Sequence, residues 1–157
     1  MERSAGIGVS ERTLKLERVF DAPRGVVFRA WIDPKQVAQW WGPRGFTNPT
    51  CEIDPRVGGA IRIVMRAPDG AEHHMQGAFR EIVTNEKLVF TNTATAPNGA
   101  LLLTGLTSVT FSERDGKTRM VLETSATATT REAAEMLKGM DIGWSETLER
   151  LTKLIGG

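Results

Sequence analysis

Apolar and polar residues alternate near the start of the chain and recur at helical spacing near its end. Residues 13–20 alternate, which predicts a half-buried strand. Asp21-Ala22-Pro23 then supplies a preferred helix cap and a proline suited to a first turn, and the apolar residues after it follow a helical period. Asp33-Pro34 repeats this arrangement and predicts a second short helix that runs to Gln39. The chain therefore opens with one strand and two short helices.

From residue 46 onward the pattern changes to short runs that are rich in β-branched and aromatic residues. These runs predict six further strands, at residues 47–54, 60–65, 74–83, 87–93, 107–112 and 119–126. Residues that tolerate positive φ stand between several of the runs and predict hairpins, at Gly58-Gly59, Asp69-Gly70, Asn85-Glu86 and Asp115-Gly116. Residues 94–106 either extend a strand or cover an opening, because the loop signal Pro97-Asn98-Gly99 is followed by an apolar run.

After Thr129 the apolar residues are spaced by three or four, which predicts one uninterrupted C-terminal helix. A helix of about 25 residues extends about 38 Å and can cross a whole sheet. The whole pattern predicts an α+β fold: a curved seven-stranded antiparallel sheet wrapped around a long C-terminal helix, with two short helices after the first strand. We expect residues 13–157 to form a single domain after a flexible tail at residues 1–12.

Composition and charge exclude several classes of protein. Lys and Arg number 20 and Asp and Glu 19, so the basic excess typical of a nucleic-acid partner is missing. The sequence contains neither a signal-peptide segment nor an apolar run long enough to span a membrane. A single cysteine, Cys51, cannot form an intramolecular disulfide, and we therefore expect a cytoplasmic protein.

Several motifs are shared with a known family. They are the helix from Ala22-Pro23 to Trp31 followed by Asp33-Pro34, the run Trp40-Trp41-Gly42-Pro43, the run Asp54-Pro55-Arg56-Val57-Gly58-Gly59, Gly77 with Glu81-Ile82, the Asp115-Gly116 turn, and Gly143-Trp144 with Leu148 and Leu151. With these motifs almost the whole chain resembles the family named for the activator of the heat-shock protein 90 ATPase. That family lies within the superfamily of START lipid-transfer domains, the birch-pollen allergen and aromatic polyketide cyclases. The resemblance implies the helix-grip fold and restricts function only loosely, because the superfamily includes binders, transporters, regulators and a few enzymes.

Three functions follow from this scaffold. The leading hypothesis is a domain without catalysis that holds a hydrophobic or aromatic small molecule between the sheet and the C-terminal helix. A cyclase- or dehydratase-like enzyme would need an acid–base group in the pocket, and the candidates are Asp141, Glu81, Arg62 and the adjacent histidines. A chaperone-associated or stress-response module would instead show an exposed apolar patch. The sequence leaves a homodimer and a chaperone contact open.

Candidate ligand-binding residues lie on the predicted inward faces of strands and helices. They are Trp31, Trp40, Trp41, Ile63, Met65, Met75, Phe79, Phe90, Asn92, Phe111, Leu122, Leu137, Met140, Asp141 and Trp144. These side chains form either a filled core or the wall of a cavity. Gly77, which lacks a side chain, and the repeated methionines favour some empty volume. Asn92, Thr124 and Asp141 are polar groups that could orient a ligand.

For two pairs of neighbouring residues on this list, the sequence leaves open which side chain points into the interior. Trp40 and Trp41 are adjacent, so at a helix end their side chains should diverge by about 100° and cannot both face the core. One is expected to pack beneath the sheet edge, while the other either caps the domain or lines the mouth of a cavity. Asp141 either lies on the inward stripe or is partly exposed, with Met140 inward in its place.

Motifs for metal binding and catalysis are missing from the sequence. His73 and His74 are consecutive, so in a strand they point to opposite faces, and we expect them to be solvated. Together with one cysteine they provide no zinc spacing. The sequence contains no serine elbow, phosphate loop or dinucleotide fingerprint, so we expect no catalytic residue, metal or cofactor. Cys51 is interpreted as an inert buried thiol.

Overall fold

The computed structural model describes residues 10–156, which form seven strands and four helices. In chain order these are β1 (Glu11–Phe20), α1 (Arg24–Ile32), α2 (Pro34–Trp40), β2 (Thr47–Ile53), β3 (Ala60–Arg66), β4 (Glu72–Val83), β5 (Lys87–Thr95), β6 (Leu101–Arg114), β7 (Lys117–Ala128), α3 (Arg131–Lys138) and α4 (Met140–Ile155). Because β1 begins at Glu11, residues 11 and 12 belong to a strand, whereas the sequence predicts them to be part of the tail. The rest of the predicted tail, residues 1–9, lies outside the described residues.

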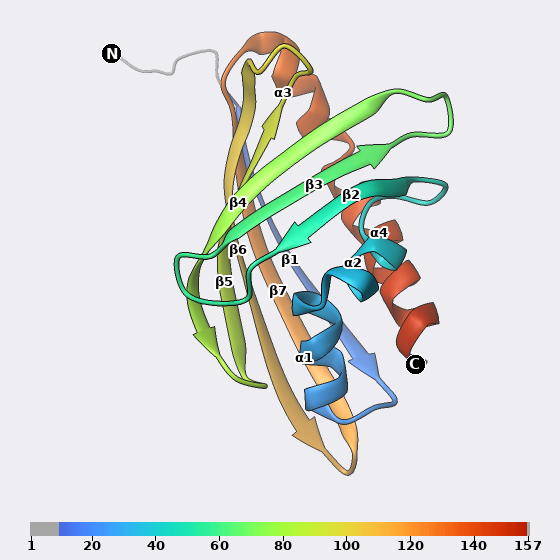
Figure 1. The fold of residues 1–157 in the computed structure, drawn as a ribbon. Helices are drawn as coiled ribbons and strands as arrows, with labels where there is room; N and C mark the ends of the chain where they lie inside the picture. Colours follow the sequence, from blue (N-terminus) through green and yellow to red (C-terminus); the bar gives the residue numbers. More distant parts are fainter. Residues whose placement is uncertain (1–9, 157) are drawn as a thin grey trace.

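One antiparallel sheet holds all seven strands in the order β1-β7-β6-β5-β4-β3-β2. Strands β2 to β7 follow one another as a meander, and β1 closes onto β7 with Glu11 opposite Thr127 and Phe20 opposite Thr118. Helices α1 and α2 carry the chain between β1 and β2, the two edge strands. Figure 1 shows the sheet curving around these helices and α4. The predicted α+β architecture is confirmed.

Two glycines allow neighbouring strands to approach closely where the sheet curves. A Cβ atom on Gly77 would collide with the carbonyl oxygen of Thr91, and one on Gly105 would collide with the carbonyl oxygen of Ser125. Glycine is required at such close approaches because any side chain would push the strands apart. Gly77 is therefore explained by a backbone contact, and its interpretation as a sign of empty volume is wrong.

The two short helices begin differently. The Asp33 side chain caps α2 by accepting a hydrogen bond from the Lys35 backbone N–H at 2.9 Å, as predicted. Asp21 does not cap α1, whose N-cap residue is Pro23. The Arg24 backbone N–H instead donates to the Glu113 carboxylate at 2.8 Å. A tertiary contact with the β6–β7 hairpin thus takes the place of the predicted local cap.

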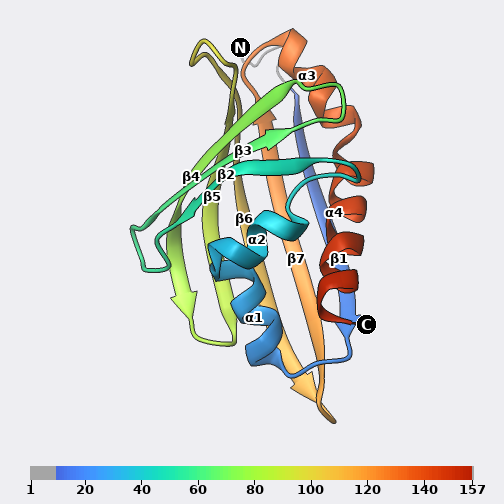
Figure 2. The ribbon, with the colours of Figure 1, turned by 45° about the vertical axis from the view of Figure 1, so that its right-hand side comes forward.

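The predicted C-terminal helix is interrupted. Gly139, with φ −93° and ψ 5°, separates α3 from α4, so the single helix of the sequence-based prediction is two helices of 8 and 16 residues. The Thr130 hydroxyl caps α3 by accepting a hydrogen bond from the Ala133 N–H at 3.0 Å. Figure 2 shows α3 at one end of the sheet and α4 running along it.

Residues 94–106, whose role the sequence left open, extend two strands. They complete β5 and begin β6, with a turn between them in which Gly99 has φ 88°. The pairing continues to Thr95 opposite Leu101. This long hairpin contacts the segment between β7 and α3, where the Thr129 backbone N–H donates to the Leu102 carbonyl at 2.9 Å.

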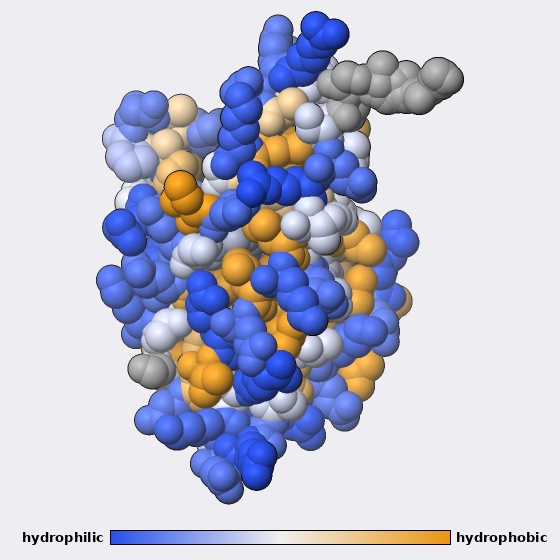
Figure 3. Space-filling model, turned by 180° about the vertical axis from the view of Figure 1, so that it is seen from behind, coloured by the Kyte–Doolittle hydropathy of each residue, from blue (hydrophilic) through white to orange (hydrophobic). Residues whose placement is uncertain are grey.

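The hydrophobic core lies between the concave face of the sheet and helices α1, α2 and α4. Aromatic rings pack across it edge to face, as in Phe28 with Phe111 at 5.6 Å and Phe79 with Phe90 at 6.2 Å between ring centroids. Figure 3, which views the molecule from behind, shows hydrophilic side chains over most of that face with hydrophobic ones between them. This matches the alternation of buried and exposed residues along the strands.

Candidate ligand-binding site

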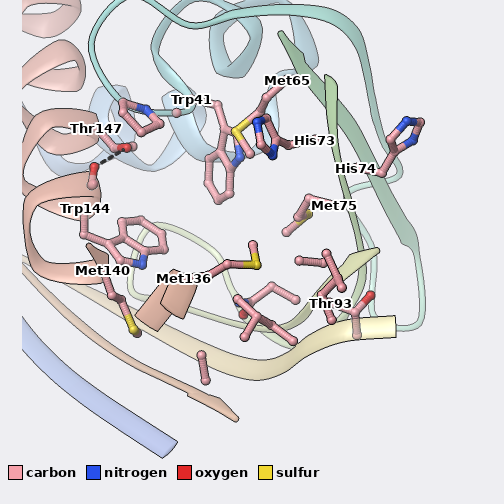
Figure 4. A pocket seen from close by; sticks show the side chains of 18 of the residues that line it. Trp41, Met65, His73, His74, Met75, Thr93, Met136, Met140, Trp144 and Thr147 are labelled. Atoms are coloured by element: carbon pink, nitrogen blue, oxygen red, sulfur yellow. Dashed lines mark hydrogen bonds between the residues drawn. The ribbon is translucent and has the colours of Figure 1, made fainter. Parts of the chain in front are cut away.

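An apolar cavity of about 420 Å³ lies between the sheet, the segment after α2, and helices α3 and α4. Figure 4 shows Trp41, Trp144, Met75 and Met136 directed toward this space. The full lining is Trp41, Gly42, Pro43, Phe46, Met65, His73, His74, Met75, Asn92, Thr93, Ala94, Thr95, Leu102, Leu103, Thr124, Ala126, Met136, Leu137, Met140, Gly143, Trp144 and Thr147. A cavity of this size and apolar character suits a small organic ligand.

Two tryptophans form the side of the cavity nearest the helices. Trp41 follows the end of α2 and Trp144 lies on α4, and their rings meet edge to face with centroids 5.6 Å apart. Gly143 precedes Trp144, and a Cβ atom there would lie within van der Waals distance of Pro43. The close approach of α4 to the segment after α2 thus brings the two rings together.

Methionines supply much of the remaining wall. Met65 and Met75 come from the sheet, and Met136 and Met140 come from the two C-terminal helices. Methionine has a flexible, polarizable side chain that adapts to irregular shapes. The wall can therefore follow the outline of a ligand without moving the backbone.

Arg150 of α4 holds the backbone that carries Trp41. Its guanidinium donates to the carbonyl oxygens of Trp41, Gly42 and Pro43 at 2.9, 2.9 and 3.1 Å, and to that of Gln39 at 3.0 Å. Burial lowers the pKa of this guanidinium. Carbonyl oxygens at the end of a helix have no helical N–H partner. Arg150 supplies hydrogen bonds to these four oxygens and thereby fixes the cavity wall.

Polar groups in the cavity form a short hydrogen-bond chain. The Thr107 hydroxyl donates to the Asn92 side-chain oxygen at 2.8 Å and lies 2.8 Å from the Thr124 hydroxyl. Thr107 and Thr124 are buried. When Thr107 donates to Asn92, it accepts from Thr124, and no partner for the Asn92 amide nitrogen is found among the described residues. Asn92 is one of the few polar residues in the mainly apolar lining of the cavity.

The two histidines lie at the cavity on the β4 side. The His73 ring packs near Phe46, with centroids 5.8 Å apart, and Figure 4 shows it beside Met65. His73 is exposed, as predicted, and His74 is half-buried, and both also belong to the lining, which the sequence did not predict. Within residues 10–156 no group of three or more His, Cys, Asp or Glu side chains could hold a metal ion. No helix in the same part of the chain is both long and apolar enough to cross a membrane.

The predicted ligand-binding residues fall into two main groups. The first group lines the cavity: Trp41, Met65, Met75, Asn92, Leu137, Met140 and Trp144. The second group fills the core nearer α1 and α2: Trp31, Trp40, Ile63, Phe79, Phe90, Phe111 and Leu122. The sequence placed both groups on the same inward faces, and only the first lines the large cavity.

One sequence-based expectation about these residues is corrected, and one alternative that the sequence left open is decided. Trp40 and Trp41 are both buried, at 0% and 9% exposure, because α2 ends at Trp40 and Trp41 has extended backbone angles. The helical divergence of neighbouring side chains therefore does not apply to them. Asp141 is not among the lining residues, since its side chain is 52% exposed and pairs with Arg12 at 2.6 Å, while Met140 lines the cavity. This is the second of the two arrangements that the sequence allowed, and it removes Asp141 from the candidate ligand-binding residues.

Sequence reasoning missed several cavity residues. Those from β5, β6, β7 and α3 are Thr93, Ala94, Thr95, Leu102, Leu103, Ala126 and Met136. Four of them, Ala94, Thr95, Leu102 and Leu103, lie within residues 94–106, whose structure the sequence left open. Thr107, which supports Asn92, could have been found, because it alternates with the predicted inward residues Val109 and Phe111.

Comparison with known proteins agrees with the shared motifs. The sequence profile of the family described as Activator of Hsp90 ATPase homolog 1-like protein matches residues 21–156. No curated protein matches the chain. Similar solved structures include a Chromobacterium violaceum protein that is 27% identical, with a TM-score of 0.79 over 92% of this chain and 97% of that one. An Arthrobacter aurescens protein is 26% identical, with a TM-score of 0.76 over 90% of this chain and 86% of that one.

A further similar structure, from Silicibacter pomeroyi, carries the name of the same family. It is 23% identical, with a TM-score of 0.76 over 90% of this chain and 96% of that one, and it supports the fold alone. The family profile spans most of the chain, from the start of α1 to the end of α4. This chain therefore belongs to the Activator of Hsp90 ATPase homolog 1-like family.

Proposed function

We propose that the protein binds a hydrophobic or aromatic small molecule in the cavity between the sheet and the C-terminal helices. The observation that carries this proposal is an apolar cavity of about 420 Å³ with one polar cluster in its wall. Most binding pockets combine an apolar lining with a few polar groups that orient the ligand. The Asn92 amide is the group that we propose to donate to a polar group of the ligand.

A cyclase- or dehydratase-like activity has weaker support. Such a reaction needs an acid–base group beside the reacting atoms. Two of the acid–base candidates from the sequence form ion pairs: Arg62 pairs with Glu52, and Glu81 pairs with Lys87. All four of these side chains are substantially exposed. His73 and His74 are the titratable side chains among the described lining residues. Turnover of a bound compound that His73→Gln abolishes, with folding unchanged, would favour the enzyme over the binding domain.

The first test is native mass spectrometry of the freshly purified protein. We expect a mass increment from a co-purifying apolar compound, and loss of that increment after denaturation and refolding. In parallel, titration of the refolded protein with 1-anilinonaphthalene-8-sulfonate should show saturable binding at one site. A protein that carries no compound and gives no saturable fluorescence change would contradict the proposal.

The second test compares two substitutions one turn apart on α4. Trp144 borders the cavity, whereas Leu148 is fully buried in the core. We expect Leu148→Ala to lower the free energy of unfolding by about 2–5 kcal/mol. The loss caused by Trp144→Ala should be smaller than the range of about 3–5 kcal/mol that is typical of a large aromatic side chain in a filled core. Trp144→Ala should weaken binding of the fluorescent probe. Equal probe binding by the wild type and Trp144→Ala would contradict a role for this ring.

A further inference from the structure

A second, much smaller cavity of about 10 Å³ lies deeper in the core, between the sheet and helices α1 and α2. Trp41 and Met75 line both cavities, so these two side chains form the partition between them. Met75 can change its side-chain rotamer at low cost, because methionine is unbranched and flexible. The partition is therefore a place where the large cavity can lengthen into the core.

One residue that lines the deeper cavity carries an unexplained hydrogen-bond donor. Trp31, which lines it, is 4% exposed, and its indole N–H is buried without a partner among the described residues. The neighbouring Trp40 shows the usual arrangement, since its indole N–H donates to the Ala30 carbonyl at 2.9 Å. A buried donor without a partner costs about 1–3 kcal/mol of stability.

A trapped water is a poor explanation for this donor. The deeper cavity has about the minimum volume for one water, but a buried water needs two to four polar partners. The lining side chains are Trp, Val, Ile, Met and Phe, none of which contains an oxygen atom. A water there would have no side-chain acceptor for its own hydrogens.

We propose that the ligand reaches past Met75 and places a hydrogen-bond acceptor, such as a carbonyl oxygen, on the Trp31 indole N–H. This inference rests on the proposed function and specifies it further. The ligand class is an elongated apolar molecule whose inner end carries the acceptor. Met75 and Trp41 act as a specificity gate, because they determine how far the ligand enters.

The test uses two probes of the same shape, 2-decanone and 2-methyl-1-decene, which differ by a carbonyl oxygen in place of a methylene. Their affinities are measured by displacement of 1-anilinonaphthalene-8-sulfonate from the wild type and from Trp31→Phe. The ratio of ketone to alkene affinity should fall roughly two- to tenfold in Trp31→Phe, as expected for loss of one hydrogen bond. An unchanged ratio would overturn the inference.

The indole N–H resonances provide a second readout that does not depend on a variant folding. In ¹H–¹⁵N spectra the Trp31 signal, assigned by its loss in Trp31→Phe or by through-space contacts, should move with the ketone and not with the alkene. Met75→Ala should strengthen ketone binding by opening the partition, whereas Met75→Leu, which keeps the volume, should not. A Trp31 signal that stays fixed while the ketone displaces the fluorescent probe would overturn this inference and leave the proposed function standing. Failure of every probe to bind would overturn both.

Discussion

Thr107 links two other polar side chains in the wall of the cavity and is itself buried. Valine has nearly the same shape but no hydroxyl, so Thr107→Val leaves the Asn92 side-chain oxygen without its donor. We expect this change to lower the free energy of unfolding by about 1–3 kcal/mol, the usual cost of a buried unpaired polar group. Chemical denaturation measures the difference directly.

The control for this prediction lies on the same strand. Thr110 is exposed on β6, and Thr110→Val should change the free energy of unfolding by less than about 0.5 kcal/mol. If the two variants are equally stable, the hydrogen-bond chain contributes nothing to folding.

Cys51 is half-buried on β2, and its environment makes the thiol unreactive. Burial raises the pKa of the Cys51 thiol to about 11, with smaller contributions from the carboxylates of Asp33 and Glu52. Since the thiolate is the nucleophile, alkylation by iodoacetamide at pH 8 should be roughly ten- to 100-fold slower in the folded protein than in urea. The rate should keep rising up to about pH 11.

The same pKa shift sets the sign of its effect on stability. Because the pKa of the Cys51 thiol is higher in the folded state, the thiol makes a stabilising contribution to the free energy of unfolding. This contribution is fully present below about pH 9 and is lost as the pH rises through about 11. An alkylation rate that levels off by pH 9 would show that the folded environment leaves the thiol unshifted.

At the scale of the elements, two glycines predict opposite effects of the same substitution. A Cβ atom on Gly139 would meet nothing within 4 Å, and its φ of −93° is open to any residue. Gly139→Ala should therefore raise the free energy of unfolding by about 0.4–1 kcal/mol, because it restricts the unfolded chain. Gly77→Ala should lower it by about 1–3 kcal/mol, because the new atom collides with the Thr91 carbonyl. Thermal unfolding of both variants checks the pair, and a stabilising Gly77→Ala would disprove the close-approach argument.

The link between α4 and the end of α2 rests on Arg150, which spans four carbonyl oxygens with two guanidinium nitrogens. Lysine has a single nitrogen and cannot reproduce this geometry. We expect Arg150→Lys to lower the free energy of unfolding by about 1–3 kcal/mol and to weaken binding of the fluorescent probe.

Arg114→Lys is the matched control for Arg150→Lys, because Arg114 is exposed at the end of β6. This control should leave both stability and probe binding unchanged. Loss of stability without any effect on the probe would separate the role of Arg150 in folding from its role in the cavity wall.

Strands and turns could be predicted from the sequence because their signals are local. Asn85 and Asp115 adopt the positive φ expected of them, as do Gly58, Gly70 and Gly116. The break at Gly139 could not be predicted in the same way, because Leu137, Met140 and Trp144 keep one helical phase across it. The start of α1 was missed for a different reason, since its cap comes from Glu113, far away in the sequence.

At the scale of the whole molecule, the cavity depends on the spacing of elements, which a single sequence does not display. Met75 and Phe79 lie on one face of β4, yet Met75 borders the large cavity whereas Phe79 is packed in the core beside the much smaller one. What separates them is where α1, α2 and α4 press against the sheet. Inward orientation was predictable from alternation, whereas the empty volume was not.

The pairing of β1 with β7 has a consequence for synthesis on the ribosome. β1 emerges first, but its partner strand begins at Lys117, and Glu11 lies opposite Thr127. Contacts so distant in sequence slow folding, and the first strand must wait with its apolar side uncovered. A backbone hydrogen bond from Asp21 to Gly156, at 3.2 Å, ties the end of β1 to the end of α4. A message truncated before residue 117 would thus deprive the nascent chain of β7 and leave β1, already made, without a partner.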